Sequence, residues 1–307
     1  MFQRTIAQGR FTLPVVATFG FAVWALHALV QTSPNDWMAW AAWAGAMGCT
    51  ALAVYMVAEM NNRFVLLRIS SRMLSSLTAM LMGTMTFMGV HLAESALALT
   101  LYVGMTIALF ATFGAARPGL SLTAFLCLGC ISLLEPRMAV LIPIVWTAQA
   151  MLRSMSLRTI LASVMGLSMP WWFFAAGCFF CDRMDILTAQ AFKVIAIGWP
   201  DYSSGSTKQW VVVGTMLLLY LLGAGYCLAN GHLDKTRVRT NYNVVMTLGG
   251  FAWLVLLLQP QLLVHILPLC LLSAAVLGGH VLAQSYGRIQ NYLCIVIAAL
   301  LVMLCVW

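Results

Sequence analysis

The chain consists of successive apolar blocks, most of them close to the length of a membrane-spanning helix, with short polar breaks between them. Residues 210–228, for example, read WVVVGTMLLLYLLGAGYCL and would be apolar on every face of a helix. About 20 such residues cross the ~30 Å hydrocarbon core of a bilayer. The strands of a membrane β-barrel alternate apolar and polar residues instead. We therefore expect an all-α fold, a polytopic bundle of transmembrane helices.

The composition points away from a soluble domain. Of the 307 residues, 63% are hydrophobic and 8% are charged, whereas soluble domains carry roughly a quarter charged residues. The net charge of +8 comes from basic residues scattered between the apolar blocks, a distribution that does not indicate nucleic-acid binding. We expect one integral membrane domain over residues 1–307, with the lipid bilayer as a partner and no nucleic-acid partner.

The polar breaks divide the chain into eleven candidate segments: 11–30, 37–60, 74–90, 95–116, 120–134, 138–152, 159–181, 210–230, 244–258, 262–284 and 292–307. The pair 120–134 and 138–152 is short, since each arm would give about 22 Å of helix. It can therefore span the membrane twice or form a re-entrant hairpin. Block 244–258 is equally short. The sequence thus predicts nine to eleven membrane segments.

The basic residues predict the orientation, because loops rich in Lys and Arg stay in the cytoplasm. A cytoplasmic amino terminus places 12 of the 16 basic residues inside: Arg4, Arg10, Arg63, Arg68, Arg72, Arg117, Arg153, Arg158, Lys235, Arg237, Arg239 and Arg288. The predicted outer set holds Arg137, Arg183, Lys193 and Lys208. Most acidic residues fall outside: Asp36, Glu94, Glu135, Asp182, Asp185 and Asp201.

The longest polar-to-mixed stretch, residues 182–209, is predicted to be an extracytoplasmic loop. Within it, apolar and polar residues alternate at helical spacing over 186–199, which is typical of a helix lying on the membrane interface. A turn-rich segment, 200–206, follows. Lys193 and Tyr202 are candidate substrate contacts on this loop. The alternative is an ordinary long connection.

Three acidic residues on the predicted outer face, Asp36, Glu94 and Asp182, are candidates for catalysis. A carboxylate there can accept a proton or hold a divalent ion. Asp36, in the first outer loop, resembles the general-base or metal-binding Asp of membrane glycosyltransferases that use lipid-linked sugars. In that family a second carboxylate is required, which Glu94 or Asp182 would supply. The alternative for Asp36 is an N-cap at the start of the next helix.

The hairpin at Glu135-Pro136-Arg137 places an acid and a base at a tight apolar turn. Glu135 and Arg137 can contact an anionic headgroup or a substrate phosphate, or they can pair with each other. His27, His265 and His280 lie inside apolar blocks and are expected to form hydrogen bonds between helices.

Nine cysteines are present, and their apolar surroundings favour packing over disulfides. Neither the cysteines nor the histidines occur at metal-ligand spacing in a suitable context, so no metal site is expected. The sequence contains no GxxxxGK[ST] or GxGxxG motif and therefore predicts no cofactor.

Residues 125–174 combine a short hairpin, a basic link, the entry Ser156-x-Arg158 and a span containing Gly and Pro. In this they resemble the middle of an uncharacterised family of bacterial multi-pass inner-membrane proteins. The link that begins at Asn61-Asn62-Arg63-Phe64 is similar to the family's connection after its second helix. The resemblance implies a bacterial cytoplasmic (inner) membrane location and carries over no activity and no site residue.

Three functional classes stay open on the sequence. The favoured prediction is a non-catalytic component of a cell-envelope assembly or secretion process, whose partners would be other membrane proteins or a lipid-linked substrate. The second is a membrane glycosyltransferase or polymerase that uses lipid-linked sugars, and the third is a transporter or flippase. Whether the chain is an enzyme depends on whether the carboxyls of Asp36, Glu94 and Asp182 meet in one pocket.

Overall fold

The computed structural model describes residues 12–31, 36–67, 71–195, 200–202, 205–231, 234–284 and 288–306. Within these ranges the protein is all-α, with twelve α-helices and no strand. In chain order the α-helices are α2 (Thr12–Gln31), α3 (Trp37–Phe64), α4 (Met73–Gly83), α5 (Leu92–Phe110), α6 (Pro118–Leu134), α7 (Ile142–Met151), α8 (Leu157–Phe180), α9 (Met184–Ile195), α10 (Thr207–Asn230), α11 (Thr236–Leu258), α12 (Leu263–Gln284) and α13 (Arg288–Val306). Three short 3-10 helices join some of them: η1 (Thr84–His91), η2 (Pro136–Leu141) and η4 (Pro260–Leu262).

Seven helices in the described ranges are long and apolar enough to cross a membrane: Thr12–Val30, Trp37–Phe64, Leu92–Phe110, Leu157–Phe180, Thr207–Asn230, Thr236–Leu258 and Pro260–Gln284. Shorter apolar helices cover Met73–Gly89, Pro118–Leu134 and Cys294–Cys305. The all-α prediction is confirmed, and the seven long apolar helices are compatible with a multi-pass integral membrane protein.

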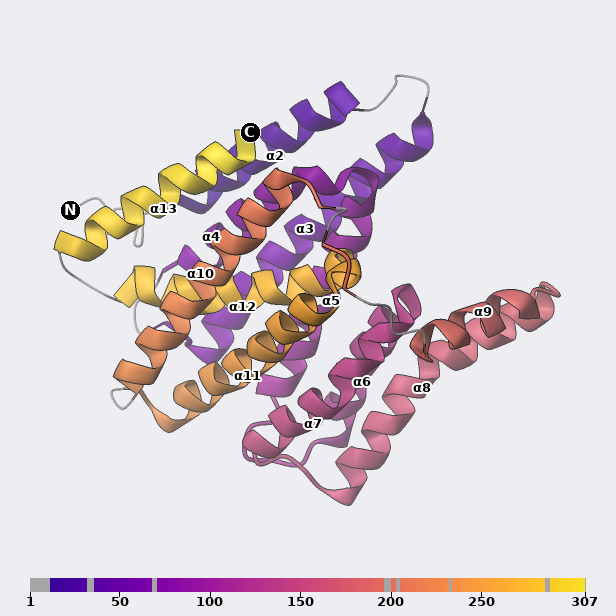
Figure 1. Ribbon diagram of the computed structural model, residues 1–307. Coiled ribbons are helices and arrows are strands. Elements are labelled where there is room, and N and C mark those ends of the chain that lie inside the picture. Colours follow the sequence, from indigo (N-terminus) through magenta and orange to yellow (C-terminus); the bar gives the residue numbers. More distant parts are fainter. Residues whose placement is uncertain are drawn as a thin grey trace.

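The core is organised around α12, which runs through the middle of the bundle (Figure 1) and is buried along nearly its whole length. Helices α4, α5, α10 and α11 pack around it. Glycines allow two of these helices to approach closely. A Cβ on Gly223 of α10 would lie 2.5 Å from the carbonyl carbon of Leu277, and one on Gly249 of α11 would lie 2.5 Å from Cβ of Ser273. Small residues at such contacts are the usual means of packing helices in a membrane.

Helices α8 and α9 extend away from this core, at the lower right of Figure 1. The first half of α8 packs against α6, where Gly129 faces Leu167 and Pro170. Beyond Pro170 the helix is largely exposed, and Trp172 and Phe173 present their rings outward. Lipid chains solvate such an apolar face as well as another helix would, so its exposure is compatible with a membrane setting.

The predicted block 244–258 is too short, because α11 already begins at Thr236. Polar residues interrupt the apolar pattern at the start of this helix, which made that stretch resemble a loop. Two of them, Asn241 and Tyr242, are nevertheless buried against the bundle. Tertiary packing therefore continues the helix through a stretch that hydropathy alone assigns to a connection.

The predicted outer stretch 182–209 does contain a helix, α9, close to the expected range 186–199. Residues 196–199 and 203–204 of this stretch lie outside the described residues. Over residues 184–194 of α9, Leu187 and Gln190 are half-buried and the other side chains are exposed. The outer location of this helix and its position on the membrane interface stay predictions.

Candidate functional site

Two helix breaks with the same polar–Pro–polar pattern lie at one end of the bundle. The first, Glu135-Pro136-Arg137, ends α6 and starts η2, and the second, Gln259-Pro260-Gln261, ends α11 and starts η4. Proline has no backbone N–H and disfavours helical geometry in the residue before it, so Glu135 and Gln259 are non-helical caps that follow the last helical residues. Both breaks therefore place polar side chains at the edge of apolar helices.

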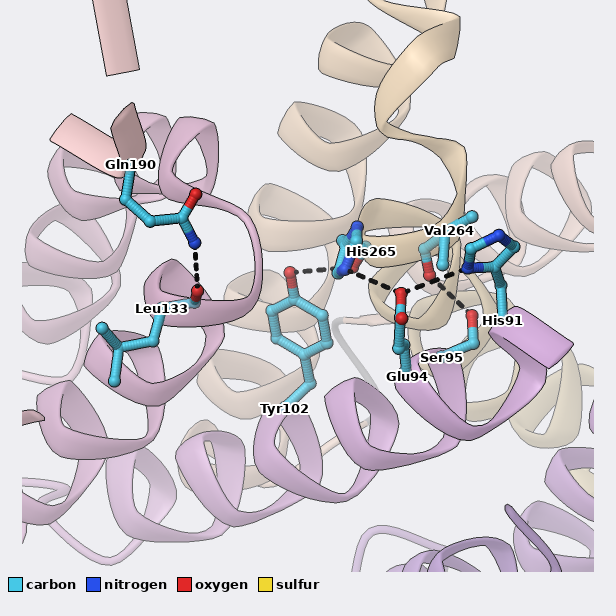
Figure 2. A network of polar contacts seen from close by, with 8 residues as sticks. All are labelled: His91, Glu94, Ser95, Tyr102, Leu133, Gln190, Val264 and His265. Carbon is cyan, nitrogen blue, oxygen red and sulfur yellow. Dashed lines mark hydrogen bonds and ion pairs between the residues drawn. The ribbon is translucent and has the colours of Figure 1, made fainter. Parts of the chain in front are cut away.

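Around the start of α12, a carboxylate lies between two imidazoles (Figure 2). Glu94 Oε2 is 3.6 Å from His265 Nε2 and 3.5 Å from His91 Nδ1. The His265 side chain is 12% exposed, whereas Glu94 and His91 are much more accessible.

Two hydrogen bonds from α5 hold the backbone at this point. Ser95 Oγ donates to the carbonyl of Val264 at 2.6 Å, and the Tyr102 hydroxyl donates to the carbonyl of His265 at 3.1 Å (Figure 2). Both carbonyls belong to the first turn of α12. Because α5 also carries Glu94, these bonds hold the carboxylate and the His265 imidazole in a defined relative position.

A second polar group forms where α9 meets the first break. Arg137 Nε lies 3.8 Å from Glu135 Oε1 and donates to the carbonyl of Lys193 at 3.4 Å. Gln190 Nε2 donates to the carbonyl of Leu133 at 3.1 Å (Figure 2). The end of α6 and the start of η2 are thereby tied to α9 at two points.

A cavity of about 400 Å³ lies between η2, α9 and the end of α11. Its lining residues are Arg137, Ala139, Val140, Val194, Val255, Leu258 and Gln259. The Tyr202 hydroxyl donates to the carbonyl of Leu257, next to the lining residue Leu258, and its ring packs on Trp210 at 5.7 Å. This volume falls within the range of small-molecule pockets. Mostly apolar walls that include a guanidinium are suited to an amphiphile with an anionic head.

The four predicted substrate contacts, Glu135, Arg137, Lys193 and Tyr202, gather around this cavity although they come from three separate stretches of the chain. Arg137 lines it directly and Val194 brings Lys193 beside it. The sequence predicts a role for each residue separately. Their convergence is a property of the tertiary structure.

The three predicted catalytic carboxylates lie on different elements of the fold. Asp36 is the N-cap of α3, and its Oδ1 accepts from the backbone N–H of Ala39 at 3.1 Å. Asp182 is exposed in the turn between α8 and α9, with a φ of +53°. Figure 1 places the turn between α8 and α9 at the end of the extension on the right, away from the bundle around α12. The ion-pair partners of Glu94 among the described residues are His91 and His265.

The three histidines in apolar blocks differ in the partners that their ring nitrogens contact. His280 forms an interhelical hydrogen bond, with Nδ1 2.7 Å from the Tyr242 hydroxyl, and His265 meets Glu94 across helices. The expectation is wrong for His27, whose Nδ1 contacts the carbonyl of Val23 in its own helix at 3.0 Å. Sequence reasoning also missed the partnership of His91 with Glu94, although their spacing of three residues on a helix was a usable signal.

Over the described ranges, no group of three or more His, Cys, Asp or Glu side chains could hold a metal ion. The nine cysteines are free thiols, most of them buried or half-buried.

Comparison of the chain with family models, with curated proteins and with solved structures found no match. The function is accordingly inferred from the geometry of the site and from the distribution of charge.

Proposed function

We propose that the chain is a multi-pass protein of a bacterial cytoplasmic membrane, with nine to eleven membrane segments and a cytoplasmic amino terminus. The described contacts are consistent with this orientation. At one end of the bundle, Arg237 of α11 lies over the Phe113 ring at 5.7 Å, and Gly114 N–H donates to the Leu152 carbonyl just before Arg153. The acidic residues Glu94 and Glu135 lie at the other end. Arg4, Arg10 and Arg68 of the predicted inner set are outside the described residues.

We further propose that it acts as a non-catalytic component of a cell-envelope assembly or secretion process, and that the outer cavity binds the head of a lipid-linked substrate. The cavity between η2, α9 and α11 carries this proposal. Its lining combines apolar side chains with the Arg137 guanidinium. This combination matches an apolar chain that ends in an anionic group.

The terminal N–H groups of Arg137 are available to bind such a headgroup. Its Nε is occupied by the Lys193 carbonyl and lies near Glu135. Among the described residues, no partner contacts its two terminal nitrogens. A guanidinium binds phosphate through pairs of N–H groups. Hydrogen bonds to charged groups contribute about 1.5–3 kcal/mol each, so Arg137 alone would account for a tenfold or larger change in affinity.

The test is binding of a fluorescent short-chain polyprenyl phosphate to the purified protein in nanodiscs. Arg137→Gln is expected to weaken binding by about tenfold or more. Arg183→Gln is the matched control, because Arg183 is an exposed arginine on the same predicted face at the α8–α9 turn. Equal affinities for Arg137→Gln and the unmodified protein would refute the proposed site.

The second candidate, a transferase that uses lipid-linked sugars, is favoured by one observation. The His265 imidazole lies 3.6 Å from the Glu94 carboxylate. A carboxylate that orients an imidazole is the usual arrangement for taking a proton from an acceptor hydroxyl. If this is the function, His265→Gln should abolish sugar transfer from a lipid-linked donor while leaving binding of the polyprenyl phosphate within about twofold.

A further inference from the structure

At the end of the bundle opposite the cavity, two arginines from distant parts of the chain share one aromatic ring. The guanidinium carbons of Arg63, at the end of α3, and Arg237, at the start of α11, each lie 5.7 Å from the centre of the Phe64 ring. Arg237 also lies 5.7 Å from the ring of Phe113. Both arginines are exposed, whereas Phe64 is buried. The two guanidinium groups therefore both contact one buried ring.

The backbone beneath these arginines is held by side-chain hydrogen bonds. Asn61 Oδ1 accepts from the N–H of Leu67 at 3.1 Å, and Asn61 Nδ2 donates to the carbonyl of Ser71 at 3.1 Å. The Tyr242 hydroxyl of α11 donates to the carbonyl of Leu66 at 3.0 Å. These bonds tie the chain that follows α3 to α11, so the two helix ends that carry the arginines are joined.

The charges of Arg63 and Arg237 are not neutralised by the described part of the chain. Glu59 lies one helical turn before Arg63, yet no carboxylate in the described ranges forms an ion pair with either arginine. Two like charges that share one ring repel each other. The aromatic contacts offset part of this repulsion, since a cation over a ring face is attracted by the ring. A bound anion that contacts both guanidinium groups would remove the remainder.

We propose that Arg63 and Arg237 form a binding site for the phosphate group of an anionic membrane lipid. Both residues lie at ends of helices that are long and apolar enough to span a membrane, which is the depth of lipid headgroups. Two guanidinium groups can donate several N–H bonds to one phosphate. The predicted orientation of the chain accounts for each of these two basic stretches separately. The proposed site brings the two together.

Native mass spectrometry of the purified full-length protein tests the proposal with three probes: dihexanoyl phosphatidylglycerol, dihexanoyl phosphatidylcholine and inorganic phosphate. Phosphatidylglycerol is expected to bind more tightly than the other two. Arg63→Gln and Arg237→Gln should each weaken its binding about tenfold, the loss of a charge-assisted hydrogen bond. Arg237→Lys keeps the charge but loses the paired donors, so its binding should fall between those of Arg237→Gln and the unmodified protein.

Arg239→Gln is the matched control, because Arg239 is exposed on the same helix and at the same end of the bundle. It should leave phosphatidylglycerol binding within about twofold if the contact is specific. Equal losses in Arg237→Gln and Arg239→Gln would overturn the proposal in favour of a diffuse surface charge. Equal binding of phosphatidylglycerol and phosphatidylcholine would also overturn it. Binding of inorganic phosphate as tight as that of phosphatidylglycerol would overturn the assignment to a lipid.

Discussion

The packing of α10 against the central helix can be tested with two substitutions two residues apart. Gly223 of α10 faces α12, and a Cβ placed on it would lie 2.5 Å from the Leu277 carbonyl carbon and 2.6 Å from Leu277 Cβ. Optimal carbon–carbon separations are about 3.5–4.0 Å. Gly225 lies on the other side of the same helix, with nothing within 4 Å of its built Cβ. Gly223→Ala must therefore push α10 and α12 apart by about 1 Å, whereas Gly225→Ala meets open space.

The expected effect is the difference in the free energy of unfolding between the two alanine variants. Each gains the same helix propensity on replacing Gly by Ala, about 1 kcal/mol in a soluble helix, and this gain cancels in the comparison. What remains is the overpacking cost at Gly223, typically about 1–3 kcal/mol. The contact involves backbone atoms of Leu277 that cannot rotate away, so the upper part of this range is expected.

The assay is reversible unfolding of the purified protein in mixed micelles, followed by circular dichroism. Gly223→Ala should lower the free energy of unfolding relative to Gly225→Ala by about 1–3 kcal/mol. Equal stabilities for the two alanine variants would show that α10 and α12 are not in close contact, and would refute the arrangement of helices around α12.

Two further predictions concern the orientation of the chain and the buried hydrogen bonds of Tyr242. Reporter fusions after Tyr202 and after Thr236 should report opposite compartments, because α10 separates the two positions; the same compartment for both would contradict the proposed topology. Tyr242→Phe removes a buried hydroxyl that donates to the Leu66 carbonyl at 3.0 Å and lies 2.7 Å from His280 Nδ1. It should lower the free energy of unfolding by about 1–3 kcal/mol, and an unchanged value in the same micelle assay would show that these contacts do not form.

The apolar blocks predicted the helices well because membrane helices are recognisable from local composition. Every chain segment that crosses hydrocarbon must satisfy its own backbone hydrogen bonds, which leaves a helix as the solution for blocks of this kind. Boundaries were less predictable where polar residues are buried. At the start of α11, Asn241 and Tyr242 lie inside the bundle, and hydropathy cannot distinguish a buried polar residue from one in a loop.

The candidate site, like the helix boundaries, could be predicted from the sequence only in part. Charged and aromatic residues in predicted outer breaks are rare enough to stand out, so Glu135, Arg137, Lys193 and Tyr202 were identifiable one by one. Asp36 was equally conspicuous, and the structure gives it the hydrogen bond of an N-cap. Spacing along the chain indicates which residue types face one side of the membrane, but it does not specify which of them share a pocket.

The sequence by itself determined the all-α class and the positions of most helices, because hydropathy acts locally and over lengths close to one span. Only the tertiary structure decided that Glu94 faces His265, that Arg137 and Gln259 line one cavity, and that Arg63 and Arg237 share the Phe64 ring. These pairings join residues far apart in the chain. They depend on which small residues allow helices to approach and on where proline ends each helix, and they follow from how the helices pack in three dimensions.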